Sequence, residues 1–349
     1  AALADKGVKL SVNDFILKAA ALDRESYQPQ LWALAIRRLQ VMGAPSLPEV
    51  QGLLTRLDAD YAPIAKLNAR DGYALAFHMA PYAIAAYRVS LAGLDYQPLL
   101  KRAQEELDAV HALGTNMEDA EQHALLVHYV AARAQVAQHK DPAPFLAAME
   151  EDRKRCLAVE PNDAPCMANA VLGEWVEADW KAQNKQPFLP ILRRALEHAM
   201  AAAQRPEKLV MPWRILAETH LRLARAEETA AARRRHVDEG LAAVQQLFAI
   251  YPKHPSGLAA QGALTLLRAG DERDAGRRLT AVREALGFLE AAQAGDALLD
   301  EGYVASLGEA RPDHVLVLDA LPRRGRQQKV DKAAIRALAR QTYHIPGAE

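Results

Sequence analysis

The chain has 349 residues; half are hydrophobic but only 6% are aromatic, and 43 basic against 44 acidic residues leave a net charge of −1. This balance gives no sign of the basic surface that binds nucleic acid or an anionic membrane. No stretch approaches the roughly 18 consecutive apolar residues of a transmembrane helix. We therefore expect neither a nucleic-acid nor a membrane partner. The abundance of Ala and Leu favours closely packed helices.

The N-terminal segment, residues 1–24, differs from the rest of the chain. It lacks the ordered basic start, apolar run and small-residue cleavage site of a signal peptide, so a cytoplasmic location is expected. Because the chain begins at Ala1 rather than Met, a fragment that has lost a targeting segment remains an alternative. Ser11 is expected to cap a helix over the residues after it.

The centre of the chain contains a segment that occurs twice. Residues 137–142, Ala-Gln-His-Lys-Asp-Pro, return at 182–187 as Ala-Gln-Asn-Lys-Gln-Pro, an offset of 45 residues. Each closing proline is followed 19 residues later by another, Pro161 and Pro206. A fixed period in this range indicates stacked supersecondary units. Since such units stack into one elongated body, the length of the chain does not indicate how many domains it has.

Apolar residues at steps of three and four predict helices between the prolines. In chain order, the expected helices span residues 48–67, 82–91, 99–113, 119–138, 143–159, 165–183, 189–204, 209–229, 237–250, 257–268 and 274–292. Successive helices pair as hairpins, and strand patterns are nearly absent. The expected fold class is all-α: an α-solenoid of antiparallel helical hairpins with a period of about 45 residues, covering 25–292.

The C-terminal stretch, residues 293–349, lies outside the repeat. From 321 to 349 it holds seven basic residues against two acidic ones. Two interpretations stay open: a cap on the last repeat, or a basic tail.

Two cysteines, Cys156 and Cys166, flank a turn signal at 160–165. The ends of two antiparallel helices can approach closely enough for a disulfide, and the alternative is two small apolar residues at a helix end and a helix start. Two cysteines without matching histidine pairs disfavour a zinc site.

Histidines and acids give no other metal or cofactor site. His123 and His128 are five residues apart on one helix, so they point to different faces, and His220 diverges from Glu218 in the same way. We interpret these residues as lying on a surface or groove. Three further acids, Asp58, Asp60 and Asp71, are expected on a solvated face. The sequence therefore predicts no cofactor and no bound metal.

The hairpins resemble extended tetratricopeptide repeats, although the usual repeat is about 34 residues long. Residues 156–164 and 257–269 are similar to the repeat arrays carried C-terminally by many bacterial serine/threonine protein kinases. This resemblance implies a protein–protein interaction scaffold that binds a peptide or partner protein on its concave face, as the sensory or docking tail of a signalling kinase. The kinase motifs themselves, the Gly-rich loop, His-Arg-Asp and Asp-Phe-Gly, are absent from the chain.

A second resemblance covers residues 3–22, which are similar to a segment of the catalytic domain of dihydrolipoyl acyltransferases of 2-oxo acid dehydrogenase complexes. That family requires His-x-x-x-Asp-Gly, whereas His314 and Asp319 here are one residue further apart and Ala320 replaces the glycine. The alternative function is therefore an acyltransferase-related enzyme or enzyme fragment. Because no nucleophile, base and oxyanion donor converge in the sequence, we expect no enzyme.

Two groups of residues are candidates for partner binding. Four aromatic residues fall in first helices of successive hairpins, which line the concave face in tetratricopeptide-like stacks: Tyr129, Trp175, Trp180 and Trp213. Their rings either contact a ligand peptide or pack between hairpins. Three arginines, Arg233, Arg234 and Arg235, replace the Lys-x-Pro loop of the other hairpins. This basic loop either holds an acidic partner or phosphate, or is simply solvated. The oligomeric state stays open.

Overall fold

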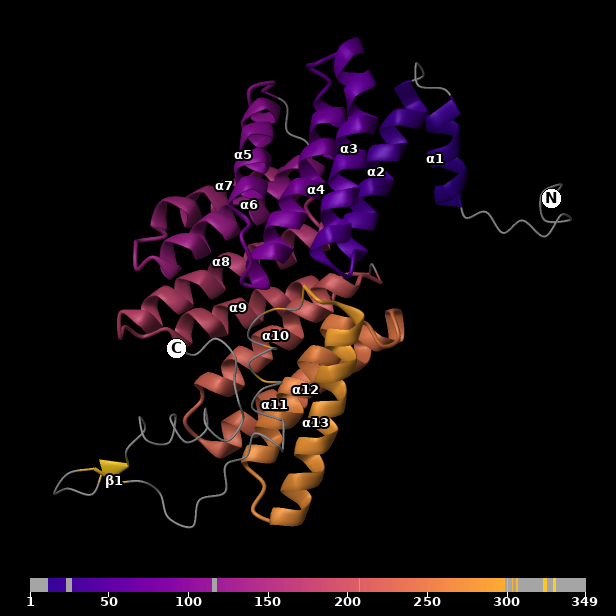
Figure 1. Ribbon diagram of the computed structural model, residues 1–349. Helices are drawn as coiled ribbons and strands as arrows, with labels where there is room; N and C mark the ends of the chain where they lie inside the picture. The colour runs from indigo at the N-terminus through magenta and orange to yellow at the C-terminus, as the bar shows by residue number, and fades with distance from the viewer. Residues whose placement is uncertain are drawn as a thin grey trace, which may run out of the picture.

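The protein is a curved stack of antiparallel helices, shown by a computed structural model in Figure 1. The structure describes residues 12–22, 27–114, 118–206, 208–298, 300, 303, 306, 323–324 and 329–330. The helices in this part of the chain are α1 (Val12–Leu22), α2 (Tyr27–Gly43), α3 (Leu47–Leu67), α4 (Gly72–Leu91), α5 (Gln97–His111), α6 (Glu118–Ala137), α7 (Ala143–Val159), α8 (Ala164–Gln183), α9 (Leu189–Ala203), α10 (Val210–Ala226), α11 (Ala230–Ile250), α12 (Pro255–Gly270) and α13 (Ala275–Gly295). Two short strands, β1 (Arg323–Arg324) and β2 (Lys329–Val330), pair antiparallel near the C-terminus. None of the described helices is long and apolar enough to cross a membrane.

The helices form hairpins that repeat along the chain, which confirms the predicted α-solenoid. The first helices α4, α6, α8 and α10 begin at Gly72, Glu118, Ala164 and Val210, each 46 residues after the one before. The return helices α5, α7 and α9 keep the same step. The expected period of about 45 residues is therefore borne out, and the step between helix starts is 46.

The difference of one residue comes from the hairpin turns. In the α6–α7 turn His139 has a positive φ of 55°, and the amide of Lys140 donates to the Gln135 carbonyl. In the α8–α9 turn Lys185 has a φ of 56°, and the amide of Gln186 donates to Lys181. The residue with positive φ is therefore the third of its Ala-Gln-x-Lys-x-Pro segment in the α6–α7 turn and the fourth in the α8–α9 turn. The two turns are 46 residues apart, although the matching segments are 45 residues apart.

Two predicted helix starts were wrong. The helix expected from 82 begins at Gly72, where the Asp71 side chain accepts the Ala74 amide, and continues through Pro81. Burial on nearly all sides of α4 offsets the hydrogen bond that a mid-helix proline removes. The helix expected from 237 begins at Ala230, because Thr229 caps its first turn by accepting the Ala232 amide.

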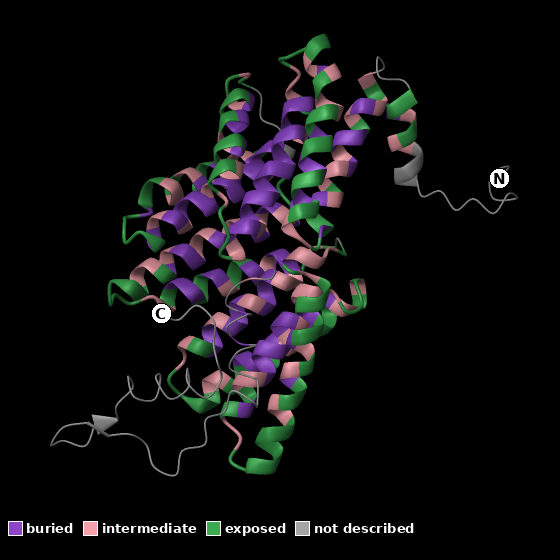
Figure 2. Cartoon of the chain, in the orientation of Figure 1, coloured by how far each residue is buried: buried purple, intermediate pink, exposed green. Residues whose placement is uncertain are grey.

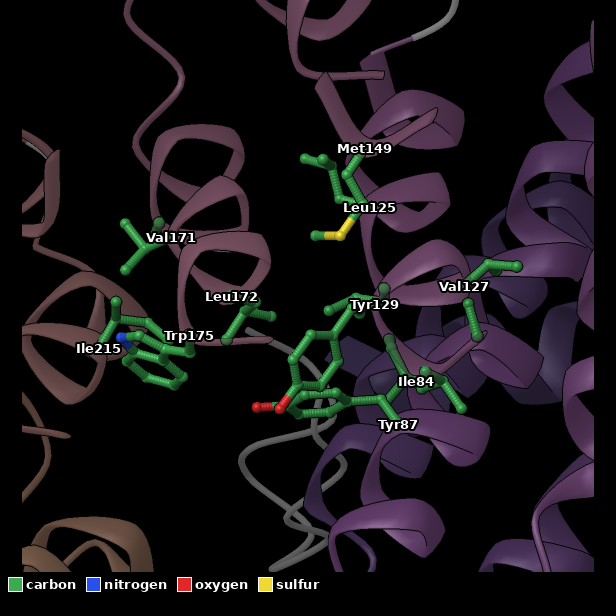
Figure 3. Close-up of a cluster of buried hydrophobic side chains, with 14 of the residues drawn as sticks. Ile84, Tyr87, Leu125, Val127, Tyr129, Met149, Val171, Leu172, Trp175 and Ile215 are labelled. Carbon is green, nitrogen blue, oxygen red and sulfur yellow. The ribbon is translucent and has the colours of Figure 1, made fainter. Parts of the chain in front are cut away.

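Large side chains fill the space between neighbouring hairpins, and the buried residues concentrate in the inner helices (Figure 2). Figure 3 shows part of this core, with Leu125 and Tyr129 from α6, Leu172 and Trp175 from α8, and Ile215 from α10 beside Trp175. Cys156 and Cys166 belong to the same core and are not joined by a disulfide, so the disulfide alternative does not hold.

Polar pairs interrupt the core at one register of two successive hairpins, α6–α7 and α8–α9. The Nδ1 of His128 in α6 lies 2.5 Å from an Asp152 carboxylate oxygen in α7. In the next hairpin Glu174 and His198, each 46 residues further along, are 3.0 Å apart with acid and base exchanged. His128 is thus a partly buried hairpin partner rather than a surface residue. A polar group at this depth needs such a partner, since an unpaired one would be costly.

The three acids expected on a solvated face all have hydrogen-bond partners; Asp58 is exposed, as expected, whereas Asp60 and Asp71 are half-buried. Asp58 accepts a hydrogen bond from Tyr82 at 2.8 Å, and Asp60 accepts one from Arg37 at 2.8 Å. Asp71 caps α4 and also accepts the Tyr27 hydroxyl at 2.7 Å. These side-chain partners lie more than 20 residues away in the sequence, beyond the reach of local patterns.

Contacts between distant parts of the chain bend the stack into a closed turn. Arg88 in α4 donates from one guanidinium nitrogen to the Val41 carbonyl at 2.7 Å and from the other to Asp296, the residue after α13, at 2.9 Å. The Ala297 amide donates to the Pro45 carbonyl at 2.8 Å. The end of the last helix is thereby held against α2, α3 and α4, as Figure 1 shows.

We expect Gly262→Ala to destabilise the fold, because α12 and α13 approach closely at this position. A Cβ there would lie 2.6 Å from the Leu289 Cγ and 3.0 Å from the Ala285 carbonyl oxygen. Overpacking of this kind costs about 1–3 kcal/mol, measured as the free energy of unfolding in urea. The control is Gly287→Ala in α13, where a Cβ meets nothing within 4 Å. Unchanged stability in Gly262→Ala would contradict the observed helix spacing.

Glu121 is expected to make the fold sensitive to acid. Its buried carboxylate lies 2.8 Å from Arg155 and 3.3 Å from His111. Burial raises the pKa of Glu121, but hydrogen bonds from His111 and Arg155 outweigh it and lower the pKa below the usual 4.5. A lowered folded-state pKa contributes stability above pH 4.5 that disappears as the pH falls through the folded-state value.

Glu121→Gln should therefore lose about 3 kcal/mol at pH 7 and show a smaller difference in unfolding free energy between pH 7 and pH 4 than the wild type. Glu151→Gln is the control, because Glu151 pairs with Lys154 on the surface at 2.8 Å and such pairs contribute little. Equal pH profiles for Glu121→Gln and the wild type would contradict the assignment.

Candidate functional site

The inner face of the turn carries a row of polar side chains at one position of successive first helices. Tyr87, Arg133, Asp179 and Arg225 succeed one another at the 46-residue step, on α4, α6, α8 and α10. Because neighbouring first helices pack against each other, residues at the same register lie side by side across them. Two residues of the row, Asp179 and Arg225, line an open pocket; we call this pocket, together with the row beside it, the inner groove.

Aromatic rings form the floor beside this row. The rings of Tyr87 and Tyr129 lie 5.6 Å apart and tilted, and both are seen in Figure 3. The Arg133 guanidinium stands over the Tyr129 ring at 5.9 Å, and that of Arg222 stands over Trp175 at 4.6 Å. The stacked guanidinium groups cover the ring faces and carry positive charge to the groove.

Helix α10 adds a chain of charges across the groove. Arg214 donates to the Tyr87 hydroxyl at 3.1 Å and lies 3.7 Å from Glu218. Arg222 donates to Asp179 at 3.1 Å and approaches Glu218 at 3.9 Å. Burial raises the pKa of Glu218, against the opposing charges of Arg222 and Arg214. Arginine suits this place because its guanidinium stays charged when it is desolvated.

Part of the chain itself lies in the inner groove. Beyond α13, Tyr303 is 7% exposed and Ser306 2% exposed, and Arg225 donates to the Ser306 hydroxyl at 3.0 Å. Burial lowers the pKa of Arg133, but negative charges, among them Asp300, outweigh it and leave that pKa raised. Asp300 and Tyr303 also border an open pocket of about 410 Å³, which Phe188, Arg222 and Arg225 line on the other side.

The predicted aromatic residues divide into two pairs. Tyr129 and Trp175 are 2% and 1% exposed. A partner in the groove would therefore contact the arginines stacked on these rings rather than the rings themselves. Trp175 also donates to the Thr219 hydroxyl at 3.3 Å. Trp180 and Trp213 are partly buried against the core. Direct contact of these rings with a partner stays a prediction.

The three predicted arginines are not in a loop, because α11 has already begun at Ala230. Arg233 pairs with Asp271 at 2.7 Å and donates to the Glu227 carbonyl, which joins the start of α11 to the end of α12. Arg234 and Arg235 are exposed. A role of this triplet in partner binding stays a prediction.

Sequence reasoning missed the arginines that make the groove: Arg133, Arg214, Arg222 and Arg225. Arg133 and Arg225 could have been found by stepping 46 residues from Tyr87, but the match of the hairpin turns suggested a step of 45. Arg214 and Arg222 have no counterpart in the preceding repeat, where Ala168 and Val176 occupy those positions.

A second cluster of polar side chains lies between α10 and α11. His220, expected on a surface or groove, is 4% exposed and meets His236 and Glu239. Burial lowers the pKa of His220 to about 4, and the charges of His236 and Arg235 act in the same direction. Burial also lowers the pKa of His236. Both rings are therefore neutral at pH 7.

Comparison with known proteins gives little beyond the fold. No protein-family model matches the chain, and no curated protein matches it. Six chains of solved structures match. One is titled "The hypoxic regulator of sterol synthesis Nro1 is a nuclear import adaptor"; it is 10% identical, covers 86% of this chain and 97% of its own, and has a TM-score of 0.44. At this similarity it carries no functional assignment.

Neither of the family resemblances is tested by these comparisons. Within the acyltransferase-like stretch, residues 12–22 form α1, which packs on α2. Ser11, the expected cap of that helix, lies outside the described residues, as do His314 and Asp319.

Proposed function

We propose that this protein is an interaction scaffold that binds an extended segment of a partner protein in the inner groove. The observation that carries this proposal is that residues of the chain itself occupy the groove. Asp300, Tyr303 and Ser306 lie three residues apart, and each contributes charge, burial or a hydrogen bond there. A partner segment with an acid, an aromatic ring and a hydroxyl at this spacing would find the same contacts.

The chemistry of the groove favours an acidic and aromatic ligand. Four arginines from α6 and α10 supply guanidinium groups, which bind carboxylates by charge-assisted hydrogen bonds. Tyr303 fills a partly apolar place beside Phe188 and Leu221, and buried aromatic anchors of this kind contribute most of the affinity in many interfaces. The pocket next to Tyr303 leaves room for a larger side chain than the chain itself supplies there.

Because the chain occupies its own groove, a partner must displace Asp300, Tyr303 and Ser306 to bind. The apparent affinity is then reduced by the fraction of molecules in which the groove is occupied. Substitutions that weaken the contacts of these three residues with the inner groove should therefore increase the affinity for an added ligand.

A labelled peptide of residues 296–306, measured by fluorescence anisotropy, tests the proposal. We expect it to bind the full chain carrying Tyr303→Ala and Ser306→Ala at least about 10-fold more tightly than the wild type. Adding Arg225→Ala to that variant should weaken binding about 10-fold, since Arg225 holds the Ser306 position. Arg225 is exposed, so its substitution leaves the core intact.

The matched control is Arg153→Ala in α7. The Arg153 side chain is 38% exposed, pairs with Glu150 of its own helix and lies outside the inner groove. This substitution should leave the affinity unchanged. The proposal fails if the peptide binds the wild type and the released variant equally, or if Arg153→Ala weakens binding as much as Arg225→Ala.

The sensory or docking tail of a bacterial kinase is the more specific form of this proposal, and it rests on the sequence resemblance. A kinase domain encoded upstream of Ala1 in the same gene would support it. The acyltransferase alternative predicts turnover of a dihydrolipoyl or acyl-coenzyme A substrate that is lost in His314→Ala.

A further inference from the structure

We propose that His220, His236 and Glu239 form a binding site for a divalent transition-metal ion, with zinc as the best fit. His220 is on α10, and the other two residues are one turn apart on α11. A bound ion would join the two helices of this hairpin. This site is separate from the inner groove and does not depend on the proposed partner binding.

The separations among the three ligand atoms match a tetrahedral ion. The Nδ1 atoms of His220 and His236 are 3.2 Å apart, and each lies 3.6 Å from the same carboxylate oxygen of Glu239. Zinc bonds of about 2.1 Å in a tetrahedron place neighbouring ligand atoms about 3.4 Å apart. One ion at bonding distance from all three atoms therefore needs shifts of only a few tenths of an ångström.

The repeat register explains how a third ligand arises here. The polar pairs of the α6–α7 and α8–α9 hairpins join the eleventh residue of the first helix to the tenth of the return helix, as in His128 with Asp152. His220 and Glu239 occupy these two positions in α10 and α11. His236 adds one ligand a turn earlier, where α7 has Met149. The ordinary polar pair thus becomes a set of three.

The surroundings of the cluster suit an ion. Beyond the His236 ring, Glu227 lies 4.0 Å from Nε2, where a carboxylate can orient a ligating imidazole. The side chains of His220 and His236 are 6% and 4% exposed, whereas that of Glu239 is 48% exposed. The ion would therefore be reached from the Glu239 side, and water would supply the fourth ligand, as in zinc sites with three protein ligands.

Two other clusters of ligand-type atoms in the described residues are less suited to an ion. In the first, of Cys156, Asp163 and Cys166, the Asp163 carboxylate already caps α8 by accepting the Cys166 amide. In the second, of His111, Glu121 and Asp152, Arg155 pairs with both acids.

Among the described residues, the ion pairs of Glu239 involve the two histidines of its own cluster. Its carboxylate is therefore not neutralised by an arginine or lysine in this part of the chain, as the acids of the second cluster are. This leaves its negative charge for a cation.

Zinc titration of the full chain, after removal of metal with a chelator, tests the site by calorimetry. We expect one ion per chain, with affinity reduced on the order of 100-fold in His236→Gln and in Glu239→Gln. The control is His198→Gln, because His198 is the tenth residue of α9, as Glu239 is of α11, and pairs with Glu174 instead. It should bind zinc as the wild type does.

Cobalt(II) provides a second readout, because a tetrahedral site with nitrogen and oxygen ligands gives strong visible absorption, whereas the octahedral aqua ion absorbs only weakly. This absorption should appear in the wild type and in His198→Gln and vanish in the other two variants. Saturating zinc should also raise the Tm of the wild type by several degrees, and that of Glu239→Gln by less.

Glu239→Gln keeps the proposal testable if His236→Gln fails to fold, because the Glu239 side chain is about half exposed. The proposal is overturned if the wild type takes up no zinc, or if zinc binds the wild type and Glu239→Gln with equal affinity. Tetrahedral cobalt absorption that survives both substitutions would place the ion elsewhere and would equally overturn it.

Discussion

The arrangement of this protein depends on one bridge, in which Arg88 of α4 joins the Val41 carbonyl to the Asp296 carboxylate. An open solenoid contacts only its neighbouring repeats, but this bridge brings the residue after α13 back to α2 and α4. The turn that results is tight enough for Arg214 of α10 to reach Tyr87 of α4. It also places the start of the C-terminal stretch beside the inner groove.

Desolvation decides what the inner groove can contain. Charges taken from water need partners, and Arg222 has both an aromatic face and a carboxylate beside it. Arg222, for example, stacks on Trp175 while it donates to Asp179. Such a surface is best satisfied when an acidic and aromatic segment fills it. The presence of Asp300 and Tyr303 from the chain itself meets that requirement.

The repeat also connects the core with the proposed metal site. One register is polar in both the α6–α7 and the α8–α9 hairpin, and its occupants change from His128 and Asp152 to Glu174 and His198 without loss of pairing. A repeat can therefore vary its chemistry at this register with little effect on the fold. His236 adds a nitrogen next to such a pair, and an architectural position thereby gains the ligand set of a zinc site.

The sequence by itself determined the all-α fold class and most of the helices, including α7 at 143–159, because apolar spacing and proline are local signals. The sequence-based prediction was wrong at Pro81, where a helix continues through the proline because its surroundings are buried. It was also wrong at Arg233, which was expected in a loop but lies in α11 because Thr229 caps that helix. Only the tertiary structure decided the inner groove and the His220 cluster. The contacts between helices that define them join residues from 16 to 127 positions apart in the sequence. Contacts at such distances depend on how the repeats stack and close, which no local pattern records.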